Sequence, residues 1–302
     1  MHQLDSQFGV STLWMPPSHG ETIFEAIEMA KRAGFKAFEI VPQVVPRFGR
    51  PSQLMSMGFY PDDMDNSFFD RLAEEVADFS MVTVHSPHVD LNIASTNRGI
   101  REESIRQFLQ LIEIGHKISA NPVTFHHGQG LPGVYIDESE FGRILKHNVD
   151  FGIEALELGE EYDIQLGYEN LGGPTAPVEK ELLQAILERI GTPRFGINLD
   201  IGHLSMVDGE PKDWIVQFGS LIKEVHIHGT YWRRDRDPAL ITHSPLEMED
   251  NFDFAEIMNE LRGVKFSGPI IFEIHAKDIP TYLDFATRGK EMLKSSCGDG
   301  LL

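Results

Sequence analysis

The fold is decided by the stretch Phe195-Gly-Ile-Asn-Leu-Asp-Ile-Gly-His203. Its first half alternates apolar with polar side chains, which is typical of a strand whose two faces meet different surroundings. Asp200 ends this strand on its polar side, and His203 follows after a turn at Gly202. A carboxylate and an imidazole three residues apart at a strand end favour a shared cation. Taken alone, the stretch also fits a half-exposed strand with a loop histidine.

Strands and helices alternate along the rest of the chain, without a break in composition. Strands are predicted at residues 8–14, 35–41, 81–85, 122–126, 164–169, 195–200, 224–228 and 270–275. Helices are predicted at residues 21–33, 67–79, 98–119, 138–161, 177–190, 211–222, 252–262 and 279–294. Strict alternation implies a parallel sheet, and eight βα units favour a closed (β/α)8 TIM barrel. We therefore expect one α/β domain over residues 1–302. An open doubly wound sheet with a second domain is the alternative.

Two connections are long for a compact domain. The chain needs residues 42–66 to pass from the second strand to the next helix, and a second long connection follows the strand at 224–228. Long loops in compact domains usually serve as lids or binding loops. We expect the first of them, at residues 42–66, to be a lid or binding loop.

Composition restricts the classes of partner. The chain has 302 residues with 26 basic and 47 acidic side chains, which gives a formal charge of −21. Such a field argues against nucleic acid and against anionic membranes as partners. The single cysteine, Cys297, cannot form an internal disulfide. The amino-terminal residues lack a signal-peptide pattern, and no apolar run approaches the ~18 residues of a membrane span. A cytoplasmic protein is expected, and a homo-oligomer is left open.

Histidine and carboxylate side chains recur where the predicted strands end. They are His85 and His88, His126 and His127, Glu169, Asp200 and His203, His226, His228 and His243, and Glu273 and His275. Each one alone fits a solvated or hydrogen-bonded loop residue. Because the carboxyl ends of barrel strands meet at one rim, the set as a whole predicts a cluster. Converging carboxylates repel one another, and a divalent cation such as Zn2+, Mn2+ or Fe2+ removes that repulsion.

Several short motifs in this order resemble the xylose-isomerase-like TIM barrels, which include endonuclease IV and sugar (phosphate) isomerases and epimerases. The motifs are Val84-His85-Ser-Pro, Phe125-His126, Tyr168-Glu169-Asn170, Asn198-Leu-Asp200-Ile-Gly-His203, Val225-His226-Ile, Thr242-His243-Ser-Pro-Leu and Ile271-Phe-Glu273. The resemblance extends over nearly the whole chain, from the first strand to the eighth.

The resemblance implies ligands for up to three metals. The set for one divalent ion in the epimerases is Glu169, Asp200, His226 and Glu273. The endonuclease-like branch adds His85 and His126, which hold a second ion together with Glu169.

Two ligands of a third ion are also implied, His203 and His243, but Ile241 stands where the family has an aspartate. Asp235 or Asp237 is a candidate substitute. The lysine-aspartate pair after the strand-seven histidine is replaced by His228-Gly229. We expect one or two ions per chain, with Zn2+ or Mn2+ favoured.

Other residues are candidates for contact with a substrate. The predicted contacts are Trp14, His88, His203, His228 and Arg236. Trp14 is suited to a sugar face but also to plain packing, and the basic run that includes Arg236 is suited to a phosphate but also to a solvated loop. A Gly-x-Gly-x-x-Gly match at residues 128–133 has no helix directly after it, so it does not predict a dinucleotide site.

Three functions are compatible with this pattern. The first is a metal-dependent isomerase or epimerase of a sugar, sugar phosphate or related polyol, acting through an enediolate. In it, Glu169 and Glu273 serve as base and acid, and His203 hydrogen-bonds a substrate oxygen. The second is an endonuclease-IV-like phosphodiesterase (AP endonuclease family 2), which the charge of −21 opposes. The third is a metal-binding barrel without catalysis. The first implies a small carbohydrate as partner.

Overall fold

Eight parallel strands close into a barrel. A computed structural model describes residues 5–47, 50–207, 209–233, 239–249 and 251–296. The strands follow one another around the barrel in the order β1, β12, β9, β8, β7, β6, β5 and β2. Their bounds are β1 Phe8–Ser11, β2 Ala37–Ile40, β5 Met81–His85, β6 Val123–His126, β7 Leu166–Glu169, β8 Phe195–Asp200, β9 Ile222–Ile227 and β12 Ile270–Phe272. The predicted TIM barrel is confirmed.

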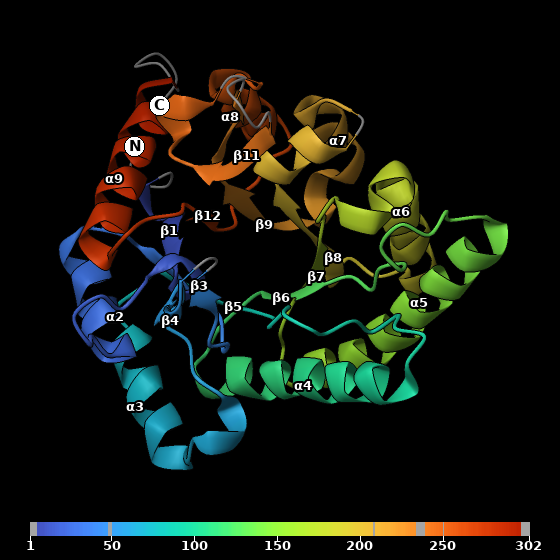
Figure 1. Ribbon diagram of the computed structural model, residues 1–302, viewed down its shortest axis with the longest axis horizontal. Coiled ribbons are helices and arrows are strands. Elements are labelled where there is room, and N and C mark those ends of the chain that lie inside the picture. The colour runs from blue at the N-terminus through green and yellow to red at the C-terminus, as the bar shows by residue number, and fades with distance from the viewer. Residues whose placement is uncertain (1–4, 48–49, 208, 234–238, 250, 297–302) are drawn as a thin grey trace.

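Helices form a ring around the strands (Figure 1). Those among the described residues are α2 Ile23–Arg32, α3 Asn66–Val76, α4 Arg98–Lys117, α5 Glu138–Glu161, α6 Glu179–Ile190, α7 Pro211–Phe218, α8 Phe254–Gly263 and α9 Ile279–Ser296. Each matches a predicted helix to within a few residues. None of these helices combines the length and the apolarity that a membrane span needs.

Short polar side chains set the beginnings of the helices. Thr22 and Glu25 form a capping box at α2, in which each side chain accepts a hydrogen bond from the other residue's backbone N–H. Asp137 caps α5 by accepting from Glu140 N. At the other end of a helix, α6 stops at Gly191, whose φ of 68° suits glycine. Local sequence thus fixes where the βα units begin and end, as helix caps generally do.

The barrel is closed between its first and last strands. β1 pairs in parallel with β12, with Phe8 opposite Ile270. The buried hydroxyl of Tyr282, on α9, donates to the carbonyl of Phe272 and accepts from the N–H of Ser11. This side chain therefore ties the last helix to both strands at the seam.

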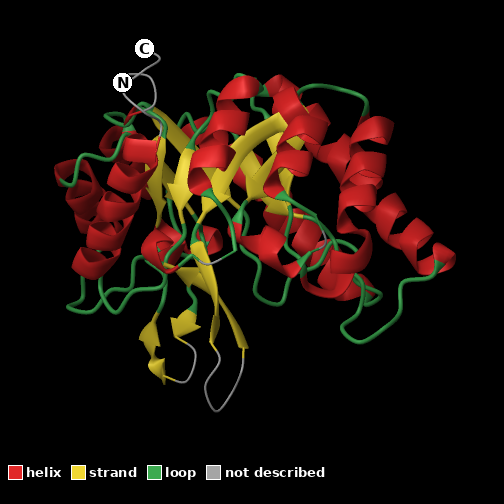
Figure 2. Ribbon diagram, turned by 90° about the horizontal axis from the view of Figure 1, so that it is seen from above, coloured by secondary structure: helices red, strands yellow, loops and turns green. Residues whose placement is uncertain are grey.

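Two hairpins stand where the sequence predicted only long loops. β3 (Pro46–Arg47) pairs with β4 (Arg50–Leu54), and β10 (Gly229–Arg233) pairs with β11 (Ala239–Ser244). Both hairpins project from the barrel on the same side (Figure 2). Each follows the carboxyl end of a barrel strand, so they border the rim where the predicted site lies.

The stretch that decided the fold is buried on both faces. All six residues of β8 are buried, so this strand is not half-exposed. Its apolar residues pack outward, as when Phe195 contacts the ring of Tyr168. Its polar side chains face the barrel interior, where Asn198 contacts His226 at 2.9 Å. The alternation of the sequence thus separates a hydrophobic helix-facing layer from a polar interior.

Candidate metal centre

Four acidic and imidazole side chains meet at the rim, all of them buried. One ligand atom from each lies within 4.8 Å of the others, and the four residues are Glu169, Asp200, His226 and Glu273. Glu169 ends β7, Asp200 ends β8, His226 lies on β9, and Glu273 follows β12. These four strands are consecutive neighbours in the barrel. The structure therefore brings together the set that the sequence predicted for one divalent ion.

The atoms of this quartet fit a cation. Nδ1 of His226 and Oδ2 of Asp200 are buried, and neither atom has a hydrogen-bond partner. Nδ1 lies 3.4 Å from Oε1 of Glu169 and 3.3 Å from Oε1 of Glu273. Buried polar atoms without partners are rare in folded proteins. Three carboxylates and one imidazole nitrogen form a set of ligands that suits a divalent ion such as Zn2+ or Mn2+.

A second group shares Glu169 with the quartet. Nε2 of His85 lies 2.7 Å from Oε2 of Glu169, and Nε2 of His126 lies 3.1 Å from the same oxygen. Burial by itself raises the pKa of the Glu169 carboxyl, but the adjacent imidazoles of His126, His226 and His85 outweigh it and hold this pKa well below its usual range. Glu169 is therefore ionised and belongs both to the quartet and to the group with His85 and His126.

The imidazole of His226 is held from behind by a residue that the sequence analysis left out. Oε2 of Glu39, on β2, lies 3.0 Å from Nε2 of His226. Burial raises the pKa of Glu39, but the charge of His226 outweighs it and lowers that pKa below its usual value. A carboxylate behind a ligating histidine fixes its tautomer and orientation. The signal was present in the sequence, since Glu39 lies near a strand end like the other candidates.

A second carboxyl, Glu224, lies deeper in the barrel beside Glu39. Its Oε2 accepts a hydrogen bond of 2.7 Å from the hydroxyl of Thr124. Burial, followed by the nearby charge of Glu39, raises the pKa of Glu224 to about 7. Glu224, Glu39 and His226 also lie within 4.8 Å of one another. This polar interior was not predicted from the sequence, because Glu224 precedes the strand end.

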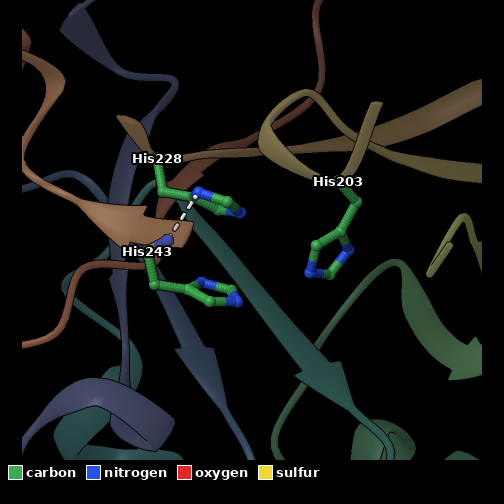
Figure 3. Close-up of side chains that lie close together, drawn as sticks. All are labelled: His203, His228 and His243. Carbon is green, nitrogen blue, oxygen red and sulfur yellow. Dashed lines mark hydrogen bonds between the residues drawn. The ribbon is translucent and has the colours of Figure 1, made fainter. Parts of the chain in front are cut away.

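A third group consists of histidines alone. His203, His228 and His243 come from the turn after β8, the end of β9 and β11, and one ring nitrogen from each lies within 4.8 Å of the others (Figure 3). His203 and His243 were the two predicted third-metal ligands, and the structure brings them together. Ile241 pairs with Tyr231 within the β10–β11 hairpin. Asp235 and Asp237, the candidate substitutes, lie outside the described residues.

The other predicted substrate contacts lie beside these groups. Trp14 is 5 % exposed and stacks on His243 with ring centroids 4.3 Å apart, so its indole packs against the histidines. His88 stacks on His126 at 5.0 Å, and its Nδ1 has no hydrogen-bond partner. Arg236 lies outside the described residues. Contact of Trp14 or His88 with a substrate stays a prediction.

A buried carboxylate positions the loop that follows β7. Glu179, the first residue of α6, accepts hydrogen bonds from the backbone N–H groups of Leu171 and Gly172. Its Oε1 also lies 2.7 Å from Nε2 of His127. These contacts fix the chain directly after Glu169, so α6 and β6 together hold the bridging carboxylate in place. His127 was predicted at the rim from the sequence, but its partner Glu179 was not.

The protein is therefore a TIM barrel with a candidate metal centre at the carboxyl ends of its strands. Residues 27–295 match the xylose isomerase-like TIM barrel family, and the chain belongs to this family.

Relatives are known from sequence and from structure. The chain is 27% identical over 297 residues to the uncharacterized protein MJ1311 of Methanocaldococcus jannaschii, covering 96% of this chain and 89% of that protein. A D-tagatose 3-epimerase-like protein superposes with a TM-score of 0.71 at 24% identity over 96% of this chain and 98% of its own. D-psicose 3-epimerase superposes with a TM-score of 0.73 at 13% identity over 97% and 99%. These structural likenesses concern the fold.

Proposed function

We propose that this protein is a divalent-metal-dependent epimerase or isomerase of a small carbohydrate. The observation that carries the proposal is the quartet of Glu169, Asp200, His226 and Glu273, whose ligand atoms lie within 4.8 Å of one another at the rim of the barrel. The named structural neighbours lend support, because they include sugar 3-epimerases. An IolI protein crystallised with a zinc atom shares the fold, with a TM-score of 0.66.

The quartet would hold the ion, and its two glutamates would move the proton. When bound, a divalent ion supplies Lewis acidity that makes the hydrogen on the carbon beside a sugar carbonyl easier to remove. Glu169 and Glu273 reach the site from β7 and from the end of β12, two strands that do not pair with each other. Two carboxylates on different sides of one carbon are suited to remove its proton and to return one from the other face.

Burial of the site serves the same chemistry. Glu169 is 2 % exposed and Glu273 is 4 % exposed. A bound sugar would cover the remaining opening and so keep water from the carbon that loses its proton. Asn170 helps to hold Asp200 in place, since its side chain accepts from Asp200 N and donates to Asp200 O.

Exchange of solvent deuterium tests the proposal. Purified protein loaded with Zn2+ or Mn2+ is incubated in D2O with a panel of ketoses, ketose phosphates and inososes, and incorporation at the carbon beside the carbonyl is followed by NMR. We expect exchange with at least one class of substrate. Glu169→Gln and Glu273→Gln should each lower the rate by at least about 10²–10⁴-fold, the usual share of acid–base catalysis, because each also removes a carboxylate from the quartet.

A matched variant controls for a loss of activity that does not come from the site. Glu154 is an exposed glutamate on α5, far from the rim, and Glu154→Gln should leave exchange unchanged. Lack of exchange across the whole panel with metal bound would count against an epimerase. Equal loss in the Glu154 and Glu273 variants would also contradict the assigned roles.

One observation favours a second candidate, a phosphodiesterase of the endonuclease-IV type. His85, His126 and Glu169 form the additional group that the resemblance assigns to that branch, with ligand atoms within 4.8 Å of one another. The formal charge of −21 opposes a nucleic-acid substrate. Incubation with duplex DNA that contains an abasic site tests it, and cleavage that Glu169→Ala abolishes would reverse the order of the two candidates.

A further inference from the structure

A backbone hydrogen bond fixes the tautomer of His228, the residue directly before the β10–β11 hairpin. The N–H of His243 donates to Nδ1 of His228 over 2.9 Å (Figure 3). The carbonyl oxygen of Gly229 also lies 3.2 Å from this Nδ1, but a nitrogen that accepts from one N–H cannot carry a proton for a carbonyl as well. Nδ1 therefore holds the lone pair, and the imidazole carries its one proton on Nε2.

The proton on Nε2 faces a carboxylate oxygen of the quartet. Nε2 of His228 lies 3.3 Å from Oδ1 of Asp200, and both side chains have 0 % exposure. A buried N–H seldom goes without an acceptor, and no other group among the described residues accepts from this one. Oδ1 also accepts a hydrogen bond of 2.7 Å from the N–H of His203. Two N–H groups of the chain thus face the same oxygen of Asp200.

The second oxygen of Asp200 is left free. Oδ2 is buried and has no hydrogen-bond partner. Nδ1 of His203 lies 3.4 Å from it, but this Nδ1 donates instead to the carbonyl oxygen of Asn170, 3.0 Å away. Because two donors of the chain face Oδ1, Oδ2 is the oxygen of Asp200 that suits a cation in the quartet.

The base of the hairpin joins two members of the quartet. His243 contacts Asp200 through His228, and its own Nδ1 lies 3.2 Å from the carbonyl oxygen of Glu273. The carbonyl oxygen of His243 accepts a hydrogen bond of 2.7 Å from the N–H of His275. His243 has a φ of 51°, a conformation that costs about 1–3 kcal/mol and is concentrated at functional sites. The end of β11 is therefore held against β12 on one side and against His228 on the other.

The turn after β8 provides the seat for the His228 ring. A Cβ atom at position 202 would lie 2.0 Å from Cε1 and 2.4 Å from Nε2 of this ring. Only glycine leaves room for the ring there, directly between Asp200 and His203 in the chain. The backbone thus keeps His228 beside Asp200 independently of the hydrogen bond to His243.

We propose that His228 is a positioning residue of the metal centre, which keeps Oδ2 of Asp200 free for the ion and joins this ligand to the base of the β10–β11 hairpin. The inference rests on the proposed function, since it takes the quartet to be the metal site. His228 binds neither the ion nor the substrate in this role, which differs from the substrate contact that the sequence predicted. It stands where the family resemblance has a lysine, so the contact belongs to this chain.

Two replacements of His228 test the proposal, because each keeps one half of the imidazole. His228→Gln can place an amide N–H near the position of Nε2, while His228→Asn can place an oxygen near Nδ1 but does not reach Asp200. Competition with a chromophoric chelator measures the affinity for Zn2+. We expect His228→Asn to weaken binding by about 10–100-fold, the usual effect of losing the partner of a metal ligand, and His228→Gln to restore most of that loss.

The controls separate this role from a purely structural one. If His228 only closes the hairpin, His228→Asn keeps the bond to His243 and binds Zn2+ at least as well as His228→Gln, which would overturn the proposal. Asp200→Asn identifies the zinc that the quartet holds. His116→Gln, which removes an exposed histidine stacked on Tyr162, should keep the wild-type affinity.

The tautomer of His228 is a second readout that needs no ion. A long-range proton–nitrogen correlation spectrum of the isotope-labelled, metal-free chain reports which ring nitrogen carries the proton, and the signal that His228→Gln removes is assigned to His228. We expect the proton on Nε2, and a proton on Nδ1 would overturn the proposal. Should His228→Asn not fold, as judged by circular dichroism, the tautomer in the wild-type chain decides.

The pattern of results distinguishes this inference from the proposed function. Unchanged zinc in Asp200→Asn would mean that the quartet holds no ion, so both would fail. Loss of zinc in Asp200→Asn together with wild-type affinity in His228→Asn would leave the metal centre in place and overturn only the role of His228.

Discussion

Oε2 of Glu39 lies 3.0 Å from Nε2 of His226, and both side chains are fully buried inside the barrel. The two residues come from β2 and β9, which are separated by two strands around the barrel. With Nε2 engaged by the carboxylate, the opposite ring nitrogen of His226 is turned toward Glu169 and Glu273. Glu39 thus orients His226 toward the quartet, although Glu39 is not itself a member of the quartet.

Removing the charge of Glu39 should weaken metal binding without removing a ligand. We expect Glu39→Gln to lower the affinity of the quartet for Zn2+ by about 10–100-fold, the usual effect of losing a carboxylate behind a ligating histidine. Competition with a chromophoric chelator measures it. Glu224→Gln is the matched control, since it alters an equally buried carboxyl that bonds to Thr124. Equal weakening in both variants would contradict a specific role for Glu39.

Breaking the support beneath the loop after β7 should lower stability. Glu179→Ala leaves His127 and two backbone N–H groups without their buried acceptor. Loss of one partner from such a buried group costs about 3–5 kcal/mol. Urea unfolding of the chelator-treated, metal-free protein measures the change in the free energy of unfolding. Glu181→Ala, at an exposed position on the same helix, should change stability by less than about 0.5 kcal/mol, and a similar loss there would refute the assignment.

Two glycine substitutions should have opposite effects. Gly202→Ala places a Cβ in the ring of His228, so we expect lower stability. Gly142 lies in α5, and a methyl group added there would meet no neighbouring atom within 4 Å outside the helix's own backbone. Gly142→Ala should therefore stabilise the protein by up to about 1 kcal/mol. Thermal unfolding checks both, and unchanged stability in Gly202→Ala would show that the ring need not rest there.

The chelator-treated protein should lose stability as the pH rises from about 6.5 toward 9. Burial lowers the pKa of His85, but its hydrogen bond to Glu169 and the charge of that carboxylate outweigh burial and raise it from 6.5 to about 9. A folded-state pKa above the unfolded value gives stabilisation that is complete below the unfolded pKa and is lost as the pH passes through the folded pKa. The size is on the order of 3 kcal/mol.

Urea unfolding at several pH values between these limits measures that loss. His85→Gln should reduce the pH dependence without abolishing it, because the pKa of His226 is also raised and acts in the same direction. A pH dependence that is identical in the wild type and in His85→Gln would exclude His85 as a source.

The sequence predicted the barrel well because its signals are local. Alternation in 195–200 and the caps of α2 and α5 are read from neighbouring residues, and the structure follows them closely. The β10–β11 hairpin was not predicted, because the charged run that begins at Arg233 and ends at Pro238 is typical of an irregular loop. Its signal was the β-rich segments on either side, such as Thr230-Tyr-Trp and Leu240-Ile-Thr.

The site was predictable in its members and, through the family resemblance, in their grouping, but not in the contacts that support them. Strand ends identified Glu169, Asp200, His226 and Glu273, because every barrel strand delivers its carboxyl end to the same rim. Which ring nitrogen faces which carbonyl depends on backbone positions that are far apart in sequence. For this reason the sequence marks Glu39 as a residue near a strand end, but not its contact with His226, 187 residues away.

The β10–β11 hairpin begins directly after His228 and ends with Ser244, the residue after His243. The N–H of His243 donates to Nδ1 of His228, so a hydrogen bond closes the base of the hairpin. The segment beyond it can then change in length and composition without disturbing the rim. Among relatives, this projecting arm is where we expect substrate preference to diversify while the chemistry beneath it is preserved.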